Sequence, residues 1–259
     1  MAKTEKELGN GWKIIHEPCM DSTNEAAKRA GDRGVAHGTI FRADIQTAGK
    51  GRRGRSWYSG EPGNLYFSIL LRPEFSPQMT SMLTLIMAYA VAVAIGEETK
   101  LKALIKWPND IVVHDKKVCG ILSEMKLDGN QPEYCVIGVG INMMQSHFPQ
   151  DIAHKATSLF AEAGKDMDDW ALLQRIVLCF EQEYEKFARA GNLTTIQEKY
   201  NELLINRDRQ VRVLDPKGEY EGMARGITRT GELLVETAPG HCTKVYAGEV
   251  SVRGLYGYV

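Results

Sequence analysis

The spacing of hydrophobic and polar residues along the chain predicts helices at some positions and strands at others. Residues 168–190 carry apolar side chains at positions 172, 173, 176, 177, 180, 184 and 187, which is the stripe of a helix with one buried face. Residues 85–95 form a nearly unbroken apolar run inside a longer predicted helix, residues 79–97. The run is shorter than the ~20 apolar residues that cross a bilayer, so we expect a buried core helix and no membrane contact.

Strands are predicted on both sides of that helix. Residues 38–43 and 64–71 precede it and are rich in apolar and β-branched side chains. Residues 110–113, 118–124 and 134–141 follow it and are separated by short polar turns. Three strands joined by short turns are typical of a β-meander.

Two further helices are predicted near the ends of the large domain. Ser22 and Glu25 have the spacing of a capping box, and the segment that they open stops at Gly31. The second helix covers residues 194–204. The large domain is therefore predicted to contain both helices and strands.

The pattern changes after Asn206. Short alternating segments are separated there by the turns Asp-Pro-Lys-Gly, Arg-Thr-Gly and Ala-Pro-Gly-His. This predicts a small all-β barrel of about fifty residues. We place the boundary near Arg207, which gives domains of residues 1–206 and 207–259.

Composition and charge exclude several classes of protein. The 259 residues carry a formal net charge of −1, whereas a chain that coats nucleic acid usually has a basic excess. The five cysteines are widely spaced, and Cys119 and Cys135 lie in apolar segments where cysteine behaves as a buried hydrophobe. The N-terminus is polar and charged, unlike a signal peptide. These features favour a cytoplasmic protein without disulfides or a zinc site.

Residues 49–57 contain the most informative segment, Gly-Lys-Gly-Arg-Arg-Gly-Arg-Ser-Trp. Four cations packed this closely repel one another unless an anion neutralises them, and arginine binds carboxylate or phosphate oxygens in pairs. The glycines also match G-x-G-x-x-G, but turn residues follow instead of a helix, which rules out a dinucleotide fingerprint. A solvated basic loop or a contact to nucleic-acid phosphates has the same composition.

Four other segments are candidates for a site, and each also has an ordinary structural explanation. Residues 106–110, Lys-Trp-Pro-Asn-Asp, are either site residues at a strand end or a polar turn with its Trp in the core. Lys117 either points into a pocket or lies on the surface. The glycines of residues 138–142 admit a ligand or form a β-bulge. Residues 21–24, Asp-Ser-Thr-Asn, contact a ligand or cap a helix.

No motif for a covalent nucleophile is present. The sequence lacks G-x-S-x-G and H-E-x-x-H, and its histidines and cysteines form no recognisable pair. The candidate chemistry is therefore the binding and neutralisation of anions. This suits phosphoryl or nucleotidyl transfer, in which positioning and charge stabilisation supply most of the catalysis.

Taken together, the segments resemble the biotin protein ligase family. The matching motifs run in order between Ser22 and Asn142: Ser-Thr-Asn, QTAGKGRRGRSW, NLYFS, KWPND, KVCGIL and GVGIN. The resemblance implies an α+β fold, with a mixed β-sheet and flanking helices like that of class II synthetases and biotin–lipoate ligases. It also implies a small C-terminal SH3-like β-barrel after the catalytic domain.

The resemblance assigns site residues to two substrates. The residues implied for biotin are Ser22, Thr23, Asn24, Gln46, Lys50, Arg52, Lys117, Gly138 and Gly140. The residues implied for ATP and the adenylate are Arg52, Arg55, Trp57, Asn109, Asp110, Lys117 and Asn142, with Trp57 against adenine. Arg52 and Lys117 are the implied catalytic cations and act together with Mg²⁺, whose ligands the sequence does not reveal.

The implied activity is the ATP-dependent formation of biotinyl-5′-AMP and the transfer of biotin to a lysine of a biotin carboxyl carrier protein. Homodimerisation through the sheet is a further implication. Only 21 residues precede Ser22, too few for a helix-turn-helix unit, so we expect a ligase without specific DNA binding. Lys50 stands where the family usually has Arg, which keeps the charge but not the forked geometry. A lipoate–protein ligase and a nucleic-acid-binding module are the alternatives.

Overall fold

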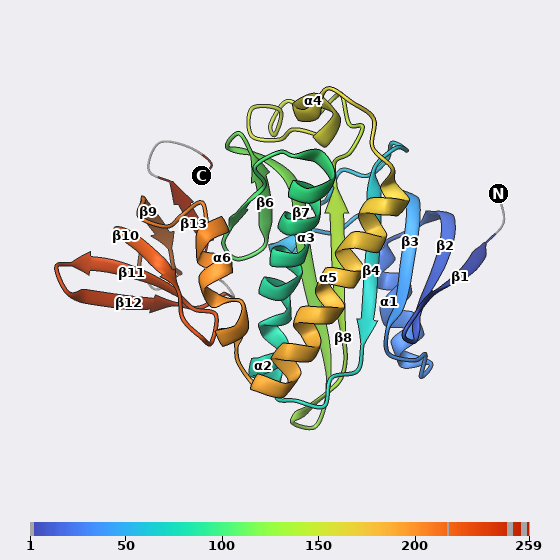
Figure 1. Cartoon of the computed structure of the whole chain (residues 1–259), viewed down its shortest axis with the longest axis horizontal. Coiled ribbons are helices and arrows are strands. Elements are labelled where there is room, and N and C mark those ends of the chain that lie inside the picture. Colours follow the sequence, from blue (N-terminus) through green and yellow to red (C-terminus); the bar gives the residue numbers. More distant parts are fainter. Residues whose placement is uncertain (1–2, 217, 248–250, 255–257, 259) are drawn as a thin grey trace.

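The computed structural model describes residues 3–216, 218–247, 251–254 and 258, which form two β-sheets and the helices packed on them (Figure 1). The large sheet has the strand order β1-β2-β3-β4-β8-β7-β6-β5. Its strands are β1 (Thr4–Gly9), β2 (Trp12–Met20), β3 (Thr39–Gln46), β4 (Leu65–Leu71), β5 (Leu104–Lys106), β6 (Asp110–Val113), β7 (Lys116–Asp128) and β8 (Gln131–Ile141). Of the strand pairs described in this sheet only β2–β3 is parallel, so the sheet is mixed, as the family resemblance implied.

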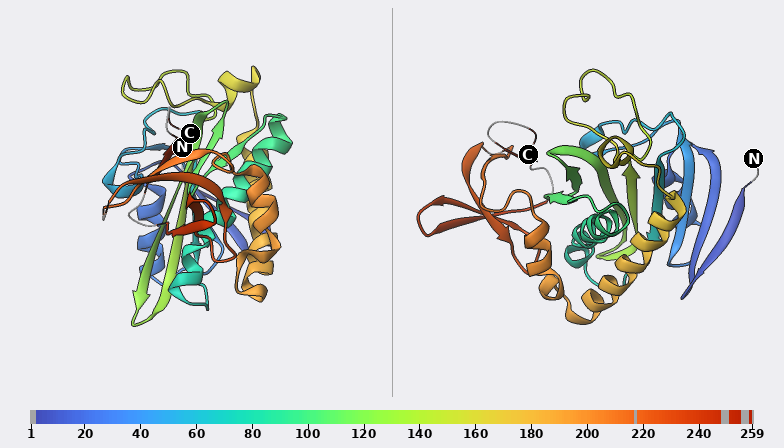
Figure 2. Two further views of the ribbon diagram at one scale, coloured as in Figure 1. Left: turned by 90° about the vertical axis from the view of Figure 1, so that its left-hand side faces the viewer. Right: turned by 45° about the horizontal axis from the view of Figure 1, so that its top comes forward.

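Helices cover both faces of this sheet. They are α1 (Thr23–Asp32), α2 (Pro77–Ser81), α3 (Leu83–Thr99), α4 (Leu159–Ala163), α5 (Asp169–Ala190) and α6 (Gln197–Leu203), with short 3₁₀ turns at Arg52–Gly54 and Leu193–Thr195. The helices α3 and α5 pack side by side on one face, and α1 lies on the other (Figure 2).

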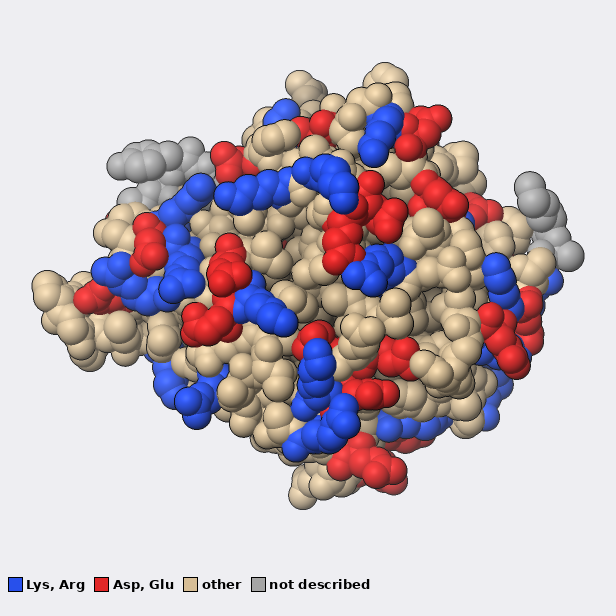
Figure 3. All heavy atoms as spheres, viewed as in Figure 1, with Lys and Arg blue, Asp and Glu red and all other residues tan. Residues whose placement is uncertain are grey.

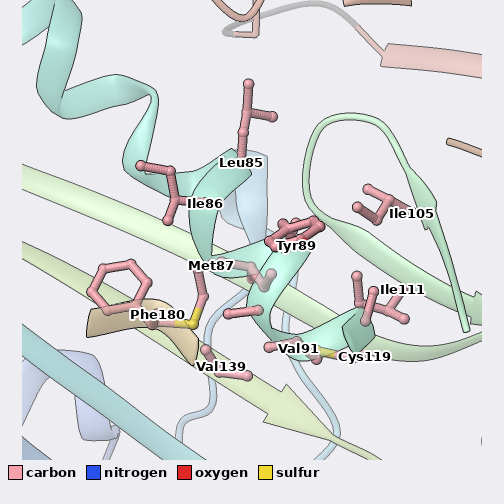
Figure 4. Close-up of a cluster of buried hydrophobic side chains, with 14 of the residues drawn as sticks. Leu85, Ile86, Met87, Tyr89, Val91, Ile105, Ile111, Cys119, Val139 and Phe180 are labelled. Carbon is pink, nitrogen blue, oxygen red and sulfur yellow. The ribbon is translucent and has the colours of Figure 1, made fainter. Parts of the chain in front are cut away.

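The alternation of side chains in β4 and β8 builds two separate cores. Phe67 and Val139 face α3 and α5, whereas Leu70 and Val136 face α1. All seven residues of β4 are buried, which explains why its sequence is apolar except at Ser68. Side chains of α3 lie between α5 and the sheet, where Met87 approaches Phe180 (Figure 4).

The predicted core helix differs from the structure at its start. The helix divides at Met82 into α2 and α3, and the stretch Pro77–Thr99 has the length and mean hydropathy, 1.9, of a membrane-spanning helix. The expectation that it is too short to cross a bilayer was therefore wrong. However, 72% of its most apolar window is buried inside the protein, which is the position of a core helix.

The sequence pattern missed the N-terminal hairpin of β1 and β2. β1 is an edge strand whose side chains are nearly all exposed, so its sequence has no hydrophobic alternation to detect. Its charged residues Glu5, Lys6 and Glu7 are typical of a protected sheet edge. β2 pairs with both β1 and β3 and positions the start of α1 at its end.

The C-terminal part forms a second, antiparallel sheet. Its strands are β9 (Gln210–Leu214), β10 (Tyr220–Ile227), β11 (Leu233–Ala238), β12 (His241–Val245) and β13 (Ser251–Gly254), in the order β12-β11-β10-β9-β13. The all-β character is confirmed, while closure into an SH3-like barrel and the boundary at Arg207 stay predictions. Trp107 joins the two parts, because its buried indole donates a 3.1 Å hydrogen bond to the Gly231 carbonyl.

Candidate active site

Two neighbouring cavities lie where β7 and β8 meet the loop of residues 49–57. The inner cavity is enclosed by the start of α1, β7, β8 and that loop, and the outer cavity by the loop, residues 106–110 and the C-terminal part. Every residue implied for biotin lines the inner cavity, and every residue implied for ATP lines the outer one. Arg52, Trp57, Asn109 and Lys117 line both. The structure therefore brings the predicted residues together.

The start of α1 presents its polar side chains to the inner cavity. Thr23 donates from its backbone N and its Oγ1 to the same oxygen, Gln46 Oε1, at 2.9 and 3.2 Å. Ser22 occupies the N-cap position, but its hydroxyl makes no capping hydrogen bond. The predicted capping box is wrong, because Glu25 pairs with Lys28 and Lys50 instead of turning back to Ser22.

Asn24 closes the inner end of the cavity. Its Oδ1 accepts from Ser68 Oγ at 2.6 Å, and its Nδ2 donates to Glu124 Oε2 at 2.8 Å. A Cβ atom at Gly138 would lie only 1.9 Å from Asn24 Oδ1. Glycine is therefore required at residue 138 for Asn24 to keep its place, which agrees with the predicted close approach to this strand.

Trp57 forms the wall between the two cavities. A Cβ atom at Gly140 would lie 2.6 Å from its Nε1, and one at Gly120 would lie 2.8 Å from its Cζ3, so the indole rests directly on two glycines. Its Nε1 is buried without a hydrogen-bond partner among the described residues. The inner cavity is consequently narrow, about 50 Å³.

The charges concentrate at the junction of the cavities. Lys117 Nζ lies 2.5 Å from Asp110 Oδ1, and 5.2 Å from the centre of the Trp57 ring. Burial acts to raise the pKa of Asp110, but Lys117 and Lys106 outweigh it and keep that pKa below its ordinary value. This carboxylate therefore stays charged and holds Lys117 at the cavity wall.

Arg52 lies on the other side of the junction. Its Nη1 donates to Asn109 Oδ1 at 2.7 Å, and Asn109 Nδ2 in turn donates to the Ile121 carbonyl at 2.9 Å. Burial lowers the pKa of Arg52, which marks a partly dehydrated guanidinium. Such a cation interacts strongly with an anion that enters the cavity.

The remaining predicted residues have fixed partners as well. Lys50 borders the inner cavity, but its Nζ pairs with Glu25 at 2.6 Å. Arg55 Nε donates to the Arg52 carbonyl at 3.3 Å, and Asn142 Nδ2 donates to the Thr157 carbonyl at 3.1 Å.

Lys106, Arg253 and Tyr258 are among the residues of the outer cavity for which the sequence predicted no contact to a substrate. Lys106 belongs to the Lys-Trp-Pro-Asn-Asp motif, whose place at a strand end was the sequence signal for it. It is buried, and burial lowers its pKa to about 8. Arg253 and Tyr258 lie more than a hundred positions further along the chain, and no motif links them to the site.

A metal ion has few candidate protein ligands here. Among the residues that the structure describes, no group of three or more His, Cys, Asp or Glu side chains is arranged to hold one. Asp110 is the carboxylate of the junction, and its partners are Lys117 and the hydroxyl of Tyr258. A divalent cation at this site would therefore depend on oxygens supplied by a substrate.

Comparison with known proteins identifies related sequences and structures. Residues 17–142 match the biotin/lipoate A/B protein ligase family, and residues 208–253 match the biotin protein ligase C-terminal domain. The bifunctional ligase/repressor BirA of Bacillus subtilis is 35% identical over 244 residues, covering 93% of this chain and 74% of that protein. The biotin–[acetyl-CoA-carboxylase] ligase of Mycobacterium tuberculosis is 28% identical, covering 93% and 90%. The Aquifex aeolicus biotin protein ligase, solved with biotin and ATP, superimposes with a TM-score of 0.81 at 32% identity and covers 93% and 98% of the two chains.

Proposed function

The chain belongs to the biotin protein ligase family, and we propose that its two cavities bind biotin and ATP for the synthesis of biotinyl-5′-AMP. The enzyme is a ligase that activates biotin with ATP and transfers it to a carboxylase. The inner cavity takes biotin and the outer cavity takes ATP. The observation that carries the assignment is the position of Arg52 and Lys117, because both cations line both cavities.

The inner cavity has the chemistry of a biotin site. A ureido group needs hydrogen-bond donors and acceptors, which Ser22, Thr23 and Asn24 supply from the start of α1. Gly138 and Gly140 carry no side chain, so a ligand can come close to the backbone of β8. Asn24 and Trp57 lie against these two glycines, so Trp57 has to shift for the bicyclic ring of biotin to enter.

Adenylation follows from the charges at the junction. The biotin carboxylate and the α-phosphate of ATP repel each other, and Arg52 and Lys117 neutralise both anions while the carboxylate oxygen attacks phosphorus. Lys117 then exchanges its contact with Asp110 for one with the substrates. The bond between the α-phosphorus and the α,β-bridging oxygen breaks, and pyrophosphate leaves with that oxygen and the bonding electrons. Mg²⁺, bound to the triphosphate, supplies further charge neutralisation.

The loop of residues 49–57 protects the product. It lies over the junction, and its backbone is tied back on itself, since Gly51 N donates to the Arg55 carbonyl at 2.7 Å and Trp57 N to the Gly49 carbonyl at 2.9 Å. An ordered loop at this place keeps water from the mixed anhydride. The acceptor amine then attacks the acyl carbon, and AMP departs.

The acceptor lysine enters through a third opening. A groove between β7, the start of α3 and the C-terminal sheet reaches the junction at Arg52 and Asn109. Glu232 lines this groove and attracts an ammonium group, whereas the carboxylate of Glu124 is already paired with Lys28 at 2.8 Å. The exposed side chain of Tyr246 at its rim offers apolar contact to a folded carrier domain.

The experiment is a single-turnover reaction followed by intact mass spectrometry. The protein is mixed with biotin and ATP, and a biotin carboxyl carrier domain is added afterwards. The proposal expects bound biotinyl-5′-AMP first, and then a carrier domain heavier by one biotinyl group on lysine. Adenylate that never reaches the carrier contradicts the acceptor assignment, and no adenylate at all contradicts the site assignment.

Three further properties are part of the proposal. Among the described residues, no strand pairs with residues 123–128 of β7 on the β6 side. This open edge supports homodimerisation through the sheet, which sedimentation at equilibrium tests. Lys/Arg and Asp/Glu side chains are interspersed over the face in Figure 3, which supports a ligase without specific DNA binding. The neutral composition supports a cytoplasmic location without a membrane partner.

A further inference from the structure

Tyr258 lines the outer cavity and lies 148 positions further along the chain than Asp110. The Tyr258 hydroxyl donates to Asp110 Oδ2, and the ring covers Lys106, whose Nζ lies 4.0 Å from the ring centre. The last part of the chain thus contacts two residues of the Lys-Trp-Pro-Asn-Asp segment in the catalytic domain.

The contact with Asp110 affects the cation that the reaction uses. The two oxygens of this carboxylate are held from different sides, Oδ2 by Tyr258 and Oδ1 by Lys117 at 2.5 Å. The hydrogen bond from the phenol fixes the rotation of the carboxylate about its χ2 angle. It also withdraws part of the negative charge, so that a phosphate competes more easily for Lys117.

The ring forms part of the cavity wall and does not fill the cavity. A space of about 430 Å³ remains open beside Tyr258, bordered also by Arg55 and Asn142. ATP therefore enters without displacing the ring. The contact between the Tyr258 ring and the ammonium group of Lys106 holds a second cation at the wall of the outer cavity. Lys106 adds there to the positive potential of the cavity.

We propose that Tyr258 is a positioning residue for adenylation, which holds Asp110 so that Lys117 is presented to the reacting carboxylate and α-phosphate. This inference rests on the proposed function, since it concerns the nucleotide half of that site. It assigns Tyr258, which follows the last strand of the small sheet, a role in the first half-reaction, apart from any role of that sheet in binding the carrier.

The test removes only the hydroxyl group. Tyr258→Phe keeps the ring over Lys106 and loses the hydrogen bond to Asp110. The matched control is Tyr220→Phe, the same change in β10 of the small sheet, where the ring packs against the core. Biotin-dependent pyrophosphate release gives kcat and the KM for ATP, calorimetry gives the Kd for biotin, and thermal unfolding gives the Tm.

Tyr258→Phe is expected to lower kcat about tenfold, because it removes a moderate hydrogen bond to a charged group. The KM for ATP is expected to change less than threefold. The Kd for biotin and the Tm are expected to match those of Tyr220→Phe. Three results overturn the inference: kcat equal to that of the control, a faster reaction, or a loss of kcat that is accompanied by an equal loss of biotin affinity. A wild-type protein that forms no biotinyl-5′-AMP overturns the proposed function as well.

Discussion

Gly138→Ala tests whether the inner cavity is the biotin site. The added methyl group would lie 1.9 Å from Asn24 Oδ1 and 2.8 Å from its Cγ, far inside van der Waals contact. Asn24 is buried at the end of the cavity and cannot keep its present rotamer. The change therefore acts on one polar side chain of the proposed ureido site, and the charges of the junction stay in place.

The magnitude follows from the bonds that Asn24 loses. It accepts from Ser68 at 2.6 Å and donates to the Glu124 carboxylate at 2.8 Å. A neutral bond contributes about 0.5–1.5 kcal/mol and a bond to a charged group about 1.5–3 kcal/mol. Neighbouring side chains relax and recover a part of the lost hydrogen-bond free energy. We expect about 1–3 kcal/mol of lost stability and a Kd for biotin raised at least about tenfold.

Isothermal titration with biotin measures the effect, and Gly60→Ala is the control. Gly60 lies in a surface loop near the site, and a Cβ atom there meets nothing within 4 Å. The control is expected to bind biotin like the wild type. A Gly138→Ala protein that is folded and binds biotin within threefold of the wild type would refute the assignment of the inner cavity.

Three other predictions concern charged groups. Lys117→Ala should slow biotin-dependent pyrophosphate release at least about tenfold with an unchanged circular dichroism spectrum, and unchanged adenylation kinetics would remove Lys117 from the site. Lys50→Ala breaks a partly exposed pair with Glu25, so urea denaturation should show a loss below about 1 kcal/mol, and a larger loss would mean that the pair anchors the loop. Burial lowers the pKa of Lys106 to about 8 in the folded protein, whereas the pKa in the unfolded protein is about 10.5. The charged form of Lys106 therefore lowers the free energy of unfolding at pH 7. This cost disappears as the pH rises from about 8 to 10.5. Lys106→Met should therefore raise the free energy of unfolding by about 1–3 kcal/mol at pH 7 and by less at pH 9.5, and an equal effect at both pH values would contradict the assigned shift.

Much of the site could be predicted because its motifs carry local physical signals. The glycines at residues 138 and 140 interrupt an apolar strand, and the structure uses them to admit Asn24 and Trp57. The cation cluster of residues 50–55 indicated an anion site without any knowledge of the fold. The helix α5 followed from periodicity, because it buries one defined face. The helix α3 and the meander followed from apolar runs bounded by turn residues.

Other features could not be predicted because their causes are not local. The strand β1 is exposed and polar, and it forms only because β2 offers it a partner. The Ser22–Glu25 spacing fits a capping box, but Lys28 and Lys50 attract the carboxylate more strongly. Tyr258 meets Asp110 across 148 positions of sequence, and only the packing of the small sheet against the large domain brings them together.

Pyrophosphate release from ATP, measured with biotin or with lipoate and without any carrier protein, tests the central claim most directly. Release is expected with biotin alone, together with a bound biotinyl-5′-AMP detected by mass spectrometry. Release with lipoate alone would contradict biotin as the substrate, although it would still agree with an adenylation reaction at this site. Release with neither, from folded protein, would contradict the claim that Arg52 and Lys117 join a biotin cavity to an ATP cavity.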